Sequence, residues 1–188
     1  MFLTMFQTDA DVLLWIQDVC VNPLLTPIMR AFTYLGNGGI LWIGTGILLC
    51  FWKRTRKAGV LLLIALTCSF VVNNLILKNL IARARPYDVI GQVLLLIAPQ
   101  SDFSFPSGHT AASFAAAMVI RKNFPRKYGL IAFAIAAIIS FSRLYLGVHY
   151  PPGFPAGVRS AGFRHADRTA GIFRRFNCFY EIYSRRAV

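Results

Sequence analysis

Acidic residues are scarce in this sequence, which has seven Asp and Glu against 20 Lys and Arg among its 188 residues. The four cysteines show no CxxC spacing. Cys20, Cys50 and Cys68 lie in apolar stretches, which favours packing roles over a disulfide framework or a zinc site. No cluster of Asp, Glu or Cys accompanies the histidines, so we expect neither a bound metal nor another cofactor. The N-terminus carries three aspartates within its first 18 residues and no basic segment, unlike a cleavable signal peptide.

Apolar residues make up 56% of the chain and its mean hydropathy is +0.56, whereas charged residues account for only 14%. This composition is typical of apolar helices joined by short charged loops. The net charge of +13 is compatible with nucleic-acid binding, but most basic residues lie between apolar runs or in the last 38 residues. A membrane protein explains that distribution better, so we expect membrane lipids and no nucleic acid as partners.

The apolar pattern predicts an all-α, polytopic transmembrane helical bundle of four spanning helices preceded by an interfacial helix. The amphipathic interfacial helix is predicted over residues 9–29, anchored by Trp15 and broken by Pro23 and Pro27. The spanning helices are predicted at Ala31–Trp52, Ala58–Leu77, Pro106–Ile120 and Tyr128–Leu146. The third is short and rich in Ala and Ser, so we expect its neighbours to enclose it.

The charges predict an orientation in the membrane. The turns at residues 53–57 and 121–127 carry eight Lys and Arg between them and lie on one face if the helices span as predicted. The positive-inside rule makes that face cytoplasmic. The crossings then bring three polar clusters to the outer face.

The first cluster lies in residues 78–86 and contains Lys78, Arg83 and Arg85. Lys supplies a point charge and Arg a planar fork of donors, and both hold phosphate oxygens well. The alternative is a basic flank that binds anionic lipid headgroups.

The second cluster is the run from Phe105 to Thr110. Pro106 suits the first position of a helix, Gly108 lets a ligand approach the backbone, and free N–H groups at a helix start attract anions. His109 can exchange a proton beside such an anion near neutral pH. The alternative is an ordinary helix cap with a chance histidine.

The third cluster runs from Ser142 to His149. Arg143 lies within an apolar run, where an ionisable residue is a functional candidate, and His149 follows at the helix exit. The alternative is an arginine that extends to the interface beside an interfacial histidine. Together the three clusters predict a cationic pocket suited to phosphoryl transfer through a histidine nucleophile.

The motifs Lys78-x6-Arg85-Pro86, Pro106-Ser107-Gly108-His109 and Ser142-Arg143-x5-His149 resemble the three-part signature of the type 2 phosphatidic acid phosphatase superfamily. The resemblance extends over about residues 9–151. It implies that His149 is the nucleophile, forming a phosphohistidine, and that His109 protonates the leaving group. It also implies that the phosphoryl oxygens are held by Lys78, Arg85, Ser107, Gly108 and Arg143.

The same resemblance implies hydrolysis of a membrane lipid phosphate or diphosphate by a multi-pass protein of the cell membrane, with its active site on the extracytoplasmic face. Undecaprenyl diphosphate is the favoured substrate, and phosphatidylglycerophosphate or phosphatidic acid is the alternative. A transporter fits less well, because the ionisable residues are predicted at one face rather than at the membrane midplane.

The sequence departs from the family pattern after about residue 151. Gly153 stands where the family has an Asp that orients the nucleophilic histidine, and residues 152–188 form an Arg-rich tail without an apolar run long enough to span. We therefore predict a phosphatase domain at 1–151 and a disordered or poorly packed tail at 152–188. A frameshift near Pro152 is one hypothesis for the tail, and natural divergence is the other. Gly153 also leaves open that the chain is a catalytically inactive membrane protein that binds phosphate.

Overall fold

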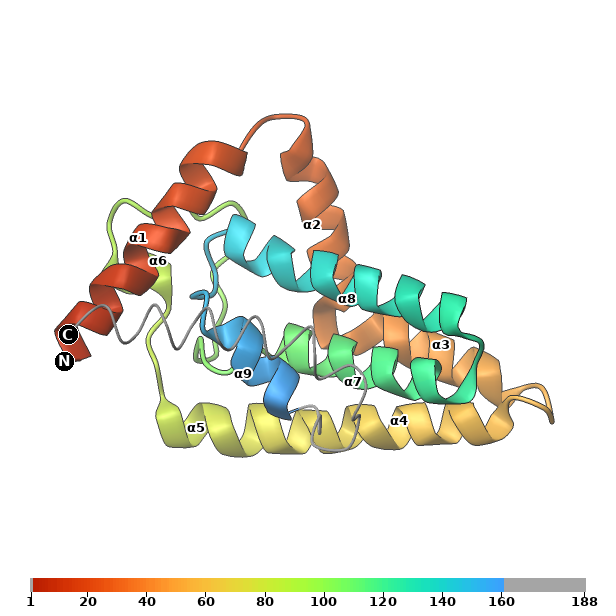
Figure 1. The fold of residues 1–188 in the computed structure, drawn as a ribbon. Coiled ribbons are helices and arrows are strands. Elements are labelled where there is room, and N and C mark those ends of the chain that lie inside the picture. Colours follow the sequence, from red (N-terminus) through yellow and green to blue (C-terminus); the bar gives the residue numbers. More distant parts are fainter. Residues whose placement is uncertain (1, 161–188) are drawn as a thin grey trace.

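The computed structural model describes residues 2–160, and this part of the chain is entirely helical apart from turns and loops (Figure 1). The elements are α1 (Phe2–Cys20), α2 (Leu25–Gly36), η1 (Asn37–Gly39), α3 (Ile40–Cys50), α4 (Arg56–Phe70), η2 (Val71–Leu77), α5 (Lys78–Ile81), α6 (Pro86–Val89), α7 (Gly108–Asn123), α8 (Arg126–Tyr145) and α9 (Gly153–Ser160). The predicted all-α class is confirmed.

The predicted interfacial helix at residues 9–29 has the wrong bounds, because the chain ends one helix at Cys20 and begins another at Leu25. Asn22 explains the new start. Its side-chain Oδ1 accepts hydrogen bonds from the backbone N–H of Leu24 (3.1 Å) and Leu25 (2.8 Å). Pro27 does not break α2, because it lies in the first turn, where a helix has no use for its missing donor.

A bend separates α2 from α3 at η1. Gly38 and Gly39 have φ values of 58° and 73°, in the left-handed region that glycine enters without steric cost. The bend directs the side of α2 that carries Thr33 and Gly36 toward α7 and α8, and it leaves Asn37 at the corner. This corner becomes one wall of the site described below.

Three helical stretches in the described part of the chain are long and apolar enough to cross a membrane: Leu25–Cys50, Arg56–Val89 and Arg126–Tyr145. They correspond to three of the four predicted spans. The remaining predicted span falls on α7, whose 16 residues measure about 24 Å against the ~30 Å of a bilayer core. Its crossing therefore stays a prediction.

Helix α7 is the centre of the bundle and packs against α4, α8 and α9. Its small side chains, among them Ala115, Ala116 and Ala117, are buried, as the Ala- and Ser-rich composition predicted. Trp42 on α3 also reaches this core, and its indole N–H donates to Ser113 Oγ (2.9 Å). The apolar side chains on the outside of α3 and α4 are largely exposed, as expected of helices that face lipid.

Beyond residue 151 the sequence predicts a poorly packed tail, but Gly153–Ser160 form α9. Phe154 packs edge-on against Phe114 of α7, with ring centroids 5.5 Å apart, and Val158 is buried in the same core. Residues 161–188, on which most of the predicted tail and the frameshift hypothesis fall, lie outside the described residues.

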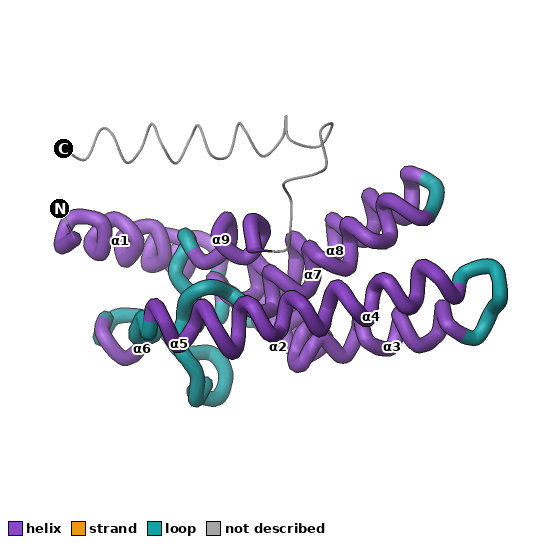
Figure 2. The backbone as a smooth tube through the Cα atoms, turned by 90° about the horizontal axis from the view of Figure 1, so that it is seen from below, coloured by secondary structure: helices purple, strands orange, loops and turns teal. Residues whose placement is uncertain are grey.

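The two basic turns lie at one end of the bundle, on the right of Figures 1 and 2. Helix α5, the start of α7 and the end of α8 lie toward the opposite end, and these carry the three polar clusters. The relative placement of turns and clusters that the sequence predicted is therefore present in the fold.

Helix α1 is tied to the loop before α7 through one buried amide. Gln17 Nε2 donates to the carbonyls of Leu94 (2.8 Å) and Tyr145 (3.2 Å), while its Oε1 accepts from the Leu94 N–H (3.0 Å). A glutamine that satisfies both its donor and its acceptor in this way links α1, the 90–105 loop and the end of α8.

Candidate active site

The structure brings the basic residues of the first and third motifs together with His149. Lys78 begins α5, Arg85 precedes α6, and Arg143 lies in the last turn of α8; all three are buried. Arg85 Nη1 lies 3.4 Å from His149 Nε2 and donates to the neighbouring carbonyl of Val148 (2.7 Å). Two segments more than 60 residues apart in sequence thus meet at one imidazole.

Arg143 is fixed by two polar side chains that the motifs do not include. Its Nη1 donates to Thr33 Oγ1 on α2 (2.7 Å), and its Nη2 donates to Gln100 Oε1 (3.3 Å). The remaining guanidinium nitrogen of Arg143, Nε, is buried and has no hydrogen-bond partner among the described residues. A buried guanidinium donor without a partner is costly, so this nitrogen is well suited to a bound anion.

His149 is held through its Nδ1 by the backbone carbonyl of Ser104, at 2.5 Å. A carbonyl only accepts, so Nδ1 carries the proton and Nε2 keeps its lone pair on the side of Arg85. Burial lowers the pKa of His149 well below its ordinary value, and the positive charges of Arg143, Arg85 and Lys78 lower it further. The imidazole is therefore neutral at pH 7, which is the form a nucleophile needs.

His109 lies in the first turn of α7 and faces the corner between α2 and α3. Its Nε2 is 2.9 Å from Asn37 Oδ1, and a Cβ atom at Gly36 would come within 2.7 Å of its ring. The positive charges of Arg143 and Lys78 lie close enough to repel a proton on His109, as they do on His149. Both histidines therefore border the same cationic cluster.

The start of α7 is capped by Ser107, whose Oγ accepts from the Thr110 N–H (3.4 Å) and lies 3.0 Å from Thr110 Oγ1. At Gly108, an added Cβ would lie 2.5 Å from Asn74 Oδ1 on η2. The absence of a side chain at Gly108 is thus required by the packing of α7 against η2, a reason that the motif alone does not reveal.

Position 153 faces the nucleophile candidate. A Cβ at Gly153 would lie 3.8 Å from His149 Nδ1 and 3.8 Å from the Ser107 backbone nitrogen. A carboxylate there would therefore reach the nitrogen that the Ser104 carbonyl now contacts. The carbonyl orients the imidazole but supplies no negative charge.

Asp102 is the main residue that the sequence interpretation missed. Its carboxylate forms ion pairs with Lys78 and Arg85. Burial would raise the pKa of Asp102, but the hydrogen bonds and charges of Lys78 and Arg85 outweigh burial and hold that pKa below its usual value. Asp102 is the only acidic residue between positions 89 and 166, and it lies four residues before the second motif. A single acid so close to a cationic motif is the feature of the sequence that could have identified it.

Arg83, two residues before Arg85, turns away from the cluster. It pairs with Asp9 of α1 at 2.6 Å and lies over the ring of Tyr150, 3.8 Å from the centroid. Of the three cations in the first cluster, Lys78 and Arg85 therefore lie in the site, whereas Arg83 attaches α1.

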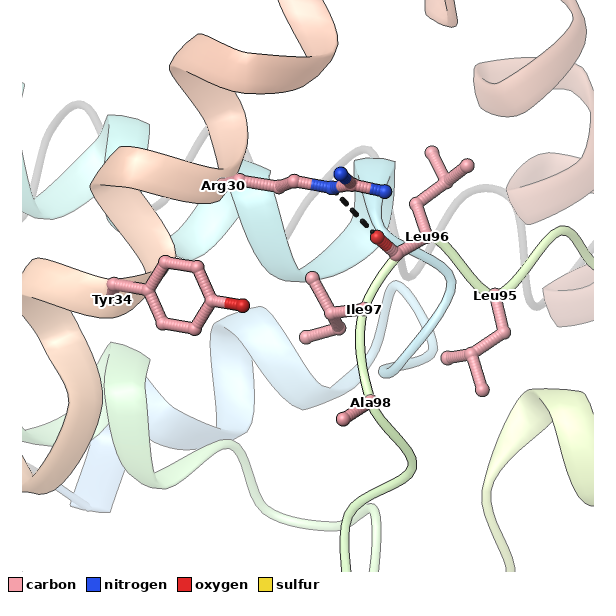
Figure 3. A pocket seen from close by; sticks show the side chains of 6 residues that line it. All are labelled: Arg30, Tyr34, Leu95, Leu96, Ile97 and Ala98. Atoms are coloured by element: carbon pink, nitrogen blue, oxygen red, sulfur yellow. Dashed lines mark hydrogen bonds between the residues drawn. The ribbon is translucent and has the colours of Figure 1, made fainter.

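A shallow pocket of ≈ 350 Å³ lies beside the Arg143 side of the cluster, between α2 and the 90–105 loop (Figure 3). Arg30 reaches across it and donates from Nε to the Leu96 carbonyl (2.8 Å), and the Tyr34 hydroxyl is turned toward Ile97. Arg30 precedes Thr33, the partner of Arg143, by one helical turn. The pocket contains none of the motif residues. It is lined by Arg30, Tyr34, Leu95, Leu96, Ile97 and Ala98.

The described residues combine an all-helical membrane fold with two imidazoles that border three buried cations, which is the arrangement of a membrane phosphatase. The chain belongs to the PAP2 superfamily, whose family model matches residues 57–159. The resemblance seen in the motifs is confirmed.

Among curated relatives, the undecaprenyl-diphosphatase of Sulfolobus acidocaldarius is 32% identical over 117 residues, which cover 62% of this chain and 56% of the relative. Phosphatidylglycerophosphatase B of Bacillus subtilis is 32% identical over 144 residues, covering 69% of this chain and 66% of the relative. The chain thus spans between about half and two thirds of the length of these relatives.

Solved structures give the same result for the fold. The transmembrane PAP2 type phosphatidylglycerolphosphate phosphatase of Bacillus subtilis superposes with a TM-score of 0.67 at 27% identity, covering 84% of this chain and 81% of that one. LpxE of Aquifex aeolicus gives a TM-score of 0.68 at 28% identity, covering 80% and 90%. The chain is therefore a membrane protein with the fold of these enzymes.

Proposed function

We propose that this protein hydrolyses a membrane lipid phosphate or diphosphate through a phosphohistidine at His149. The observation that carries the proposal is the convergence of Lys78, Arg85 and Arg143 around a neutral imidazole whose unprotonated Nε2 lies beside the Arg85 guanidinium. Buried cations with donors aimed at one point stabilise the charge that develops on a transferred phosphoryl group.

In the proposed first step, His149 Nε2 attacks the terminal phosphorus, the Nε2–P bond forms and the bond from phosphorus to the leaving-group oxygen breaks. That oxygen belongs to the lipid alcohol in a monophosphate and bridges the two phosphorus atoms in a diphosphate. His109, which takes up a proton beside the negative charge of the bound phosphoryl group, gives that proton to the leaving-group oxygen. In the second step water attacks phosphorus and gives its proton to His109, while the N–P bond breaks and orthophosphate leaves. Lys78, Arg85 and Arg143 hold the phosphoryl oxygens throughout, and the start of α7 at Ser107 and Gly108 adds the positive end of a helix dipole.

Undecaprenyl diphosphate is the substrate that we favour, and phosphatidylglycerophosphate or phosphatidic acid is the alternative. The Sulfolobus relative bears the name of the first activity and the Bacillus relative that of the second, so both belong to the family's range. We also propose that the site opens to the extracytoplasmic face, since the basic turns lie at the other end of the bundle.

Gly153 favours a second candidate, a phosphate-binding membrane protein with little or no turnover. A residue at this position faces His149 Nδ1, and glycine offers it no carboxylate to stabilise the imidazolium-like charge of the phosphohistidine. The Ser104 carbonyl fulfils only the orienting part of that role, so we expect turnover below that of an otherwise equal Asp-bearing enzyme.

The test is release of orthophosphate from a short-chain prenyl diphosphate by the purified protein in detergent, with a chelator present. The proposal expects release that persists with chelator and is lost in His149→Ala. Arg83→Ala, which removes a cation outside the cluster, serves as the matched control. Release that depends on added divalent metal, or that survives in His149→Ala, contradicts the histidine mechanism.

Binding of orthophosphate without any release identifies the second candidate instead. In that case the thermal stability of the protein rises with phosphate concentration while no turnover is measured.

A further inference from the structure

The proposed phosphate site already contains an anion that belongs to the protein. Asp102 Oδ2 pairs with Lys78 Nζ, and its Oδ1 pairs with Arg85 Nη2. A carboxylate that spreads its two oxygens over a lysine and an arginine satisfies those donors much as two oxygens of a phosphoryl group do. The carboxylate and the substrate therefore have the same partners.

The three side chains differ in how firmly they are held. The Asp102 side chain is 48% exposed, whereas those of Lys78 and Arg85 are 6% and 3% exposed. Arg85 is also fixed by the backbone, since its Nε donates to the Asp102 carbonyl and its Nη1 to the Val148 carbonyl, both at 2.7 Å. The carboxylate has hydrogen bonds only with the two cations among the described residues. A rotation of the Asp102 side chain can thus withdraw the carboxylate without moving Lys78 or Arg85.

The position of Asp102 in the chain allows such a rotation. It lies in the loop between α6 and α7 rather than within a helix, and its neighbours Phe103 and Ser101 are exposed. The Ser104 backbone, which contacts His149, is anchored separately, because its N–H donates to the Arg83 carbonyl (2.9 Å) and its Oγ to the Ala84 carbonyl (2.7 Å). The carboxylate can move while the contact to His149 stays.

We propose that Asp102 is a displaceable occupant of the phosphate site. Its carboxylate neutralises Lys78 and Arg85 in the free protein and yields both cations to the phosphoryl group when substrate binds. This inference rests on the proposed function, since it takes those two cations as phosphate ligands.

Two consequences follow for binding. Each incoming phosphoryl group replaces ion pairs that already exist, so phosphate binds more weakly than to bare cations. The returning carboxylate also competes with orthophosphate after hydrolysis, which favours release of the product. The opposite role is a fixed scaffold, in which Asp102 stays in place and aligns Lys78 and Arg85 for the substrate.

Asp102→Asn separates the two roles, because asparagine keeps the shape and one acceptor but lacks the charge. The matched control is Asp9→Asn, which makes the same change in the Asp9–Arg83 pair outside the cluster. The full-length protein in detergent is titrated with inorganic phosphate at constant ionic strength, and both the Kd and the thermal stability are measured.

A displaceable occupant predicts that Asp102→Asn is less stable without phosphate, because two buried cations lose their counter-charge. It also predicts a Kd for phosphate lower than that of the original protein by on the order of tenfold to a hundredfold. Asp9→Asn is expected to leave the Kd unchanged. A Kd in Asp102→Asn that is equal or higher overturns the inference and leaves the phosphate site intact. A protein that shows no phosphate binding in any variant overturns the proposed site together with the inference.

A second measurement tests displacement against simple repulsion by a carboxylate that stays in place. Difference infrared spectra with and without phosphate are expected to show a shift of a carboxylate stretching band that is absent from Asp102→Asn. Tighter binding in the variant without such a band in the original protein overturns displacement.

Discussion

The two histidines of the site are held in contrasting ways. His149 is 2% exposed, and a backbone carbonyl fixes its Nδ1. His109 is only partly buried, and it contacts the side-chain amide of Asn37 at the bend between α2 and α3. The orientation of the His149 ring therefore depends on the main chain at Ser104, and that of the His109 ring on the rotatable side chain of Asn37.

This difference fits the two proposed roles. A nucleophile must meet phosphorus along a fixed line, and a rigid carbonyl contact provides that line. A group that first gives a proton to a lipid oxygen and later takes one from water needs access to both. The partly exposed position of His109 beside a glycine bend provides that access.

The largest effect that distinguishes the two histidines is expected from His109→Asn. Without a proton donor, hydrolysis of a lipid phosphate should slow by about 10²–10⁴. Nitrophenyl phosphate, whose leaving group needs no proton, should be hydrolysed with a much smaller loss. Rates for both substrates, measured on variants with matched thermal stability, check this. Equal losses for the two substrates would show that His109 is not the acid.

Gly153→Asp places a carboxylate beside His149 and the start of α7 at Ser107 but not beside His109 among the nearest atoms. A carboxylate at this position reaches Nδ1 and stabilises positive charge on the ring, so we expect kcat to rise by about tenfold to a hundredfold. The expected gain is below the ~10⁴ lost when the analogous Asp of a serine protease is replaced, because the Ser104 carbonyl already orients the imidazole. Gly153→Asn, similar in size but uncharged, is the control, and an equal gain in both variants contradicts the electrostatic explanation.

Arg143→Lys tests one of the cations whose charges act on both histidines. Lysine keeps the charge but loses the fork that contacts Thr33 and Gln100, so we expect kcat/KM to fall by about tenfold. Arg83→Lys, outside the cluster, should change kcat/KM by less than about twofold. Similar losses in the two variants would contradict the assignment of Arg143 to the site.

The smallest expected effect is a pH dependence of stability. The pKa of His149 is lower in the folded state than its ordinary ~6.5, so the unfolded chain binds the extra proton as pH falls below that value. The free energy of unfolding should then decrease by up to about 1.4 kcal/mol for each pH unit below ~6.5. Unfolding of the original protein and of His149→Asn between pH 8 and 5.5 checks this. The variant should show a shallower slope.

The sequence predicted the helical class, the basic turns and the residues that gather at the site, because each follows from local composition or a short motif. Lys78, Arg85 and Arg143 were identified in this way, and their convergence follows from the order of the helices. The start of α2 does not follow from the pattern, because Pro27 is equally typical of a helix break and of a first helical turn, and Asn22 caps the helix only through contacts that the fold creates.

The partners of the motif residues could not be predicted. Thr33 and Gln100 lie far from Arg143 in sequence and carry no local pattern. The contact of His149 comes from the main chain of Ser104, and a backbone carbonyl has no signal in the sequence. The reason for glycine at position 108 is likewise a packing contact with Asn74, 34 positions earlier. Such contacts depend on tertiary structure.

The amide of Gln17 has a practical consequence for work with this protein. It satisfies both the N–H and the carbonyl of Leu94, in the loop that also carries Gln100, Asp102 and Ser104. Removing α1 to obtain a shorter protein would leave the backbone N–H and carbonyl of Leu94 without these partners. The 90–105 loop, which contacts the proposed nucleophile His149 through Ser104, would then be held less firmly. Helix α1, at the edge of the ribbon in Figure 1, therefore supports the loop that carries part of the candidate site.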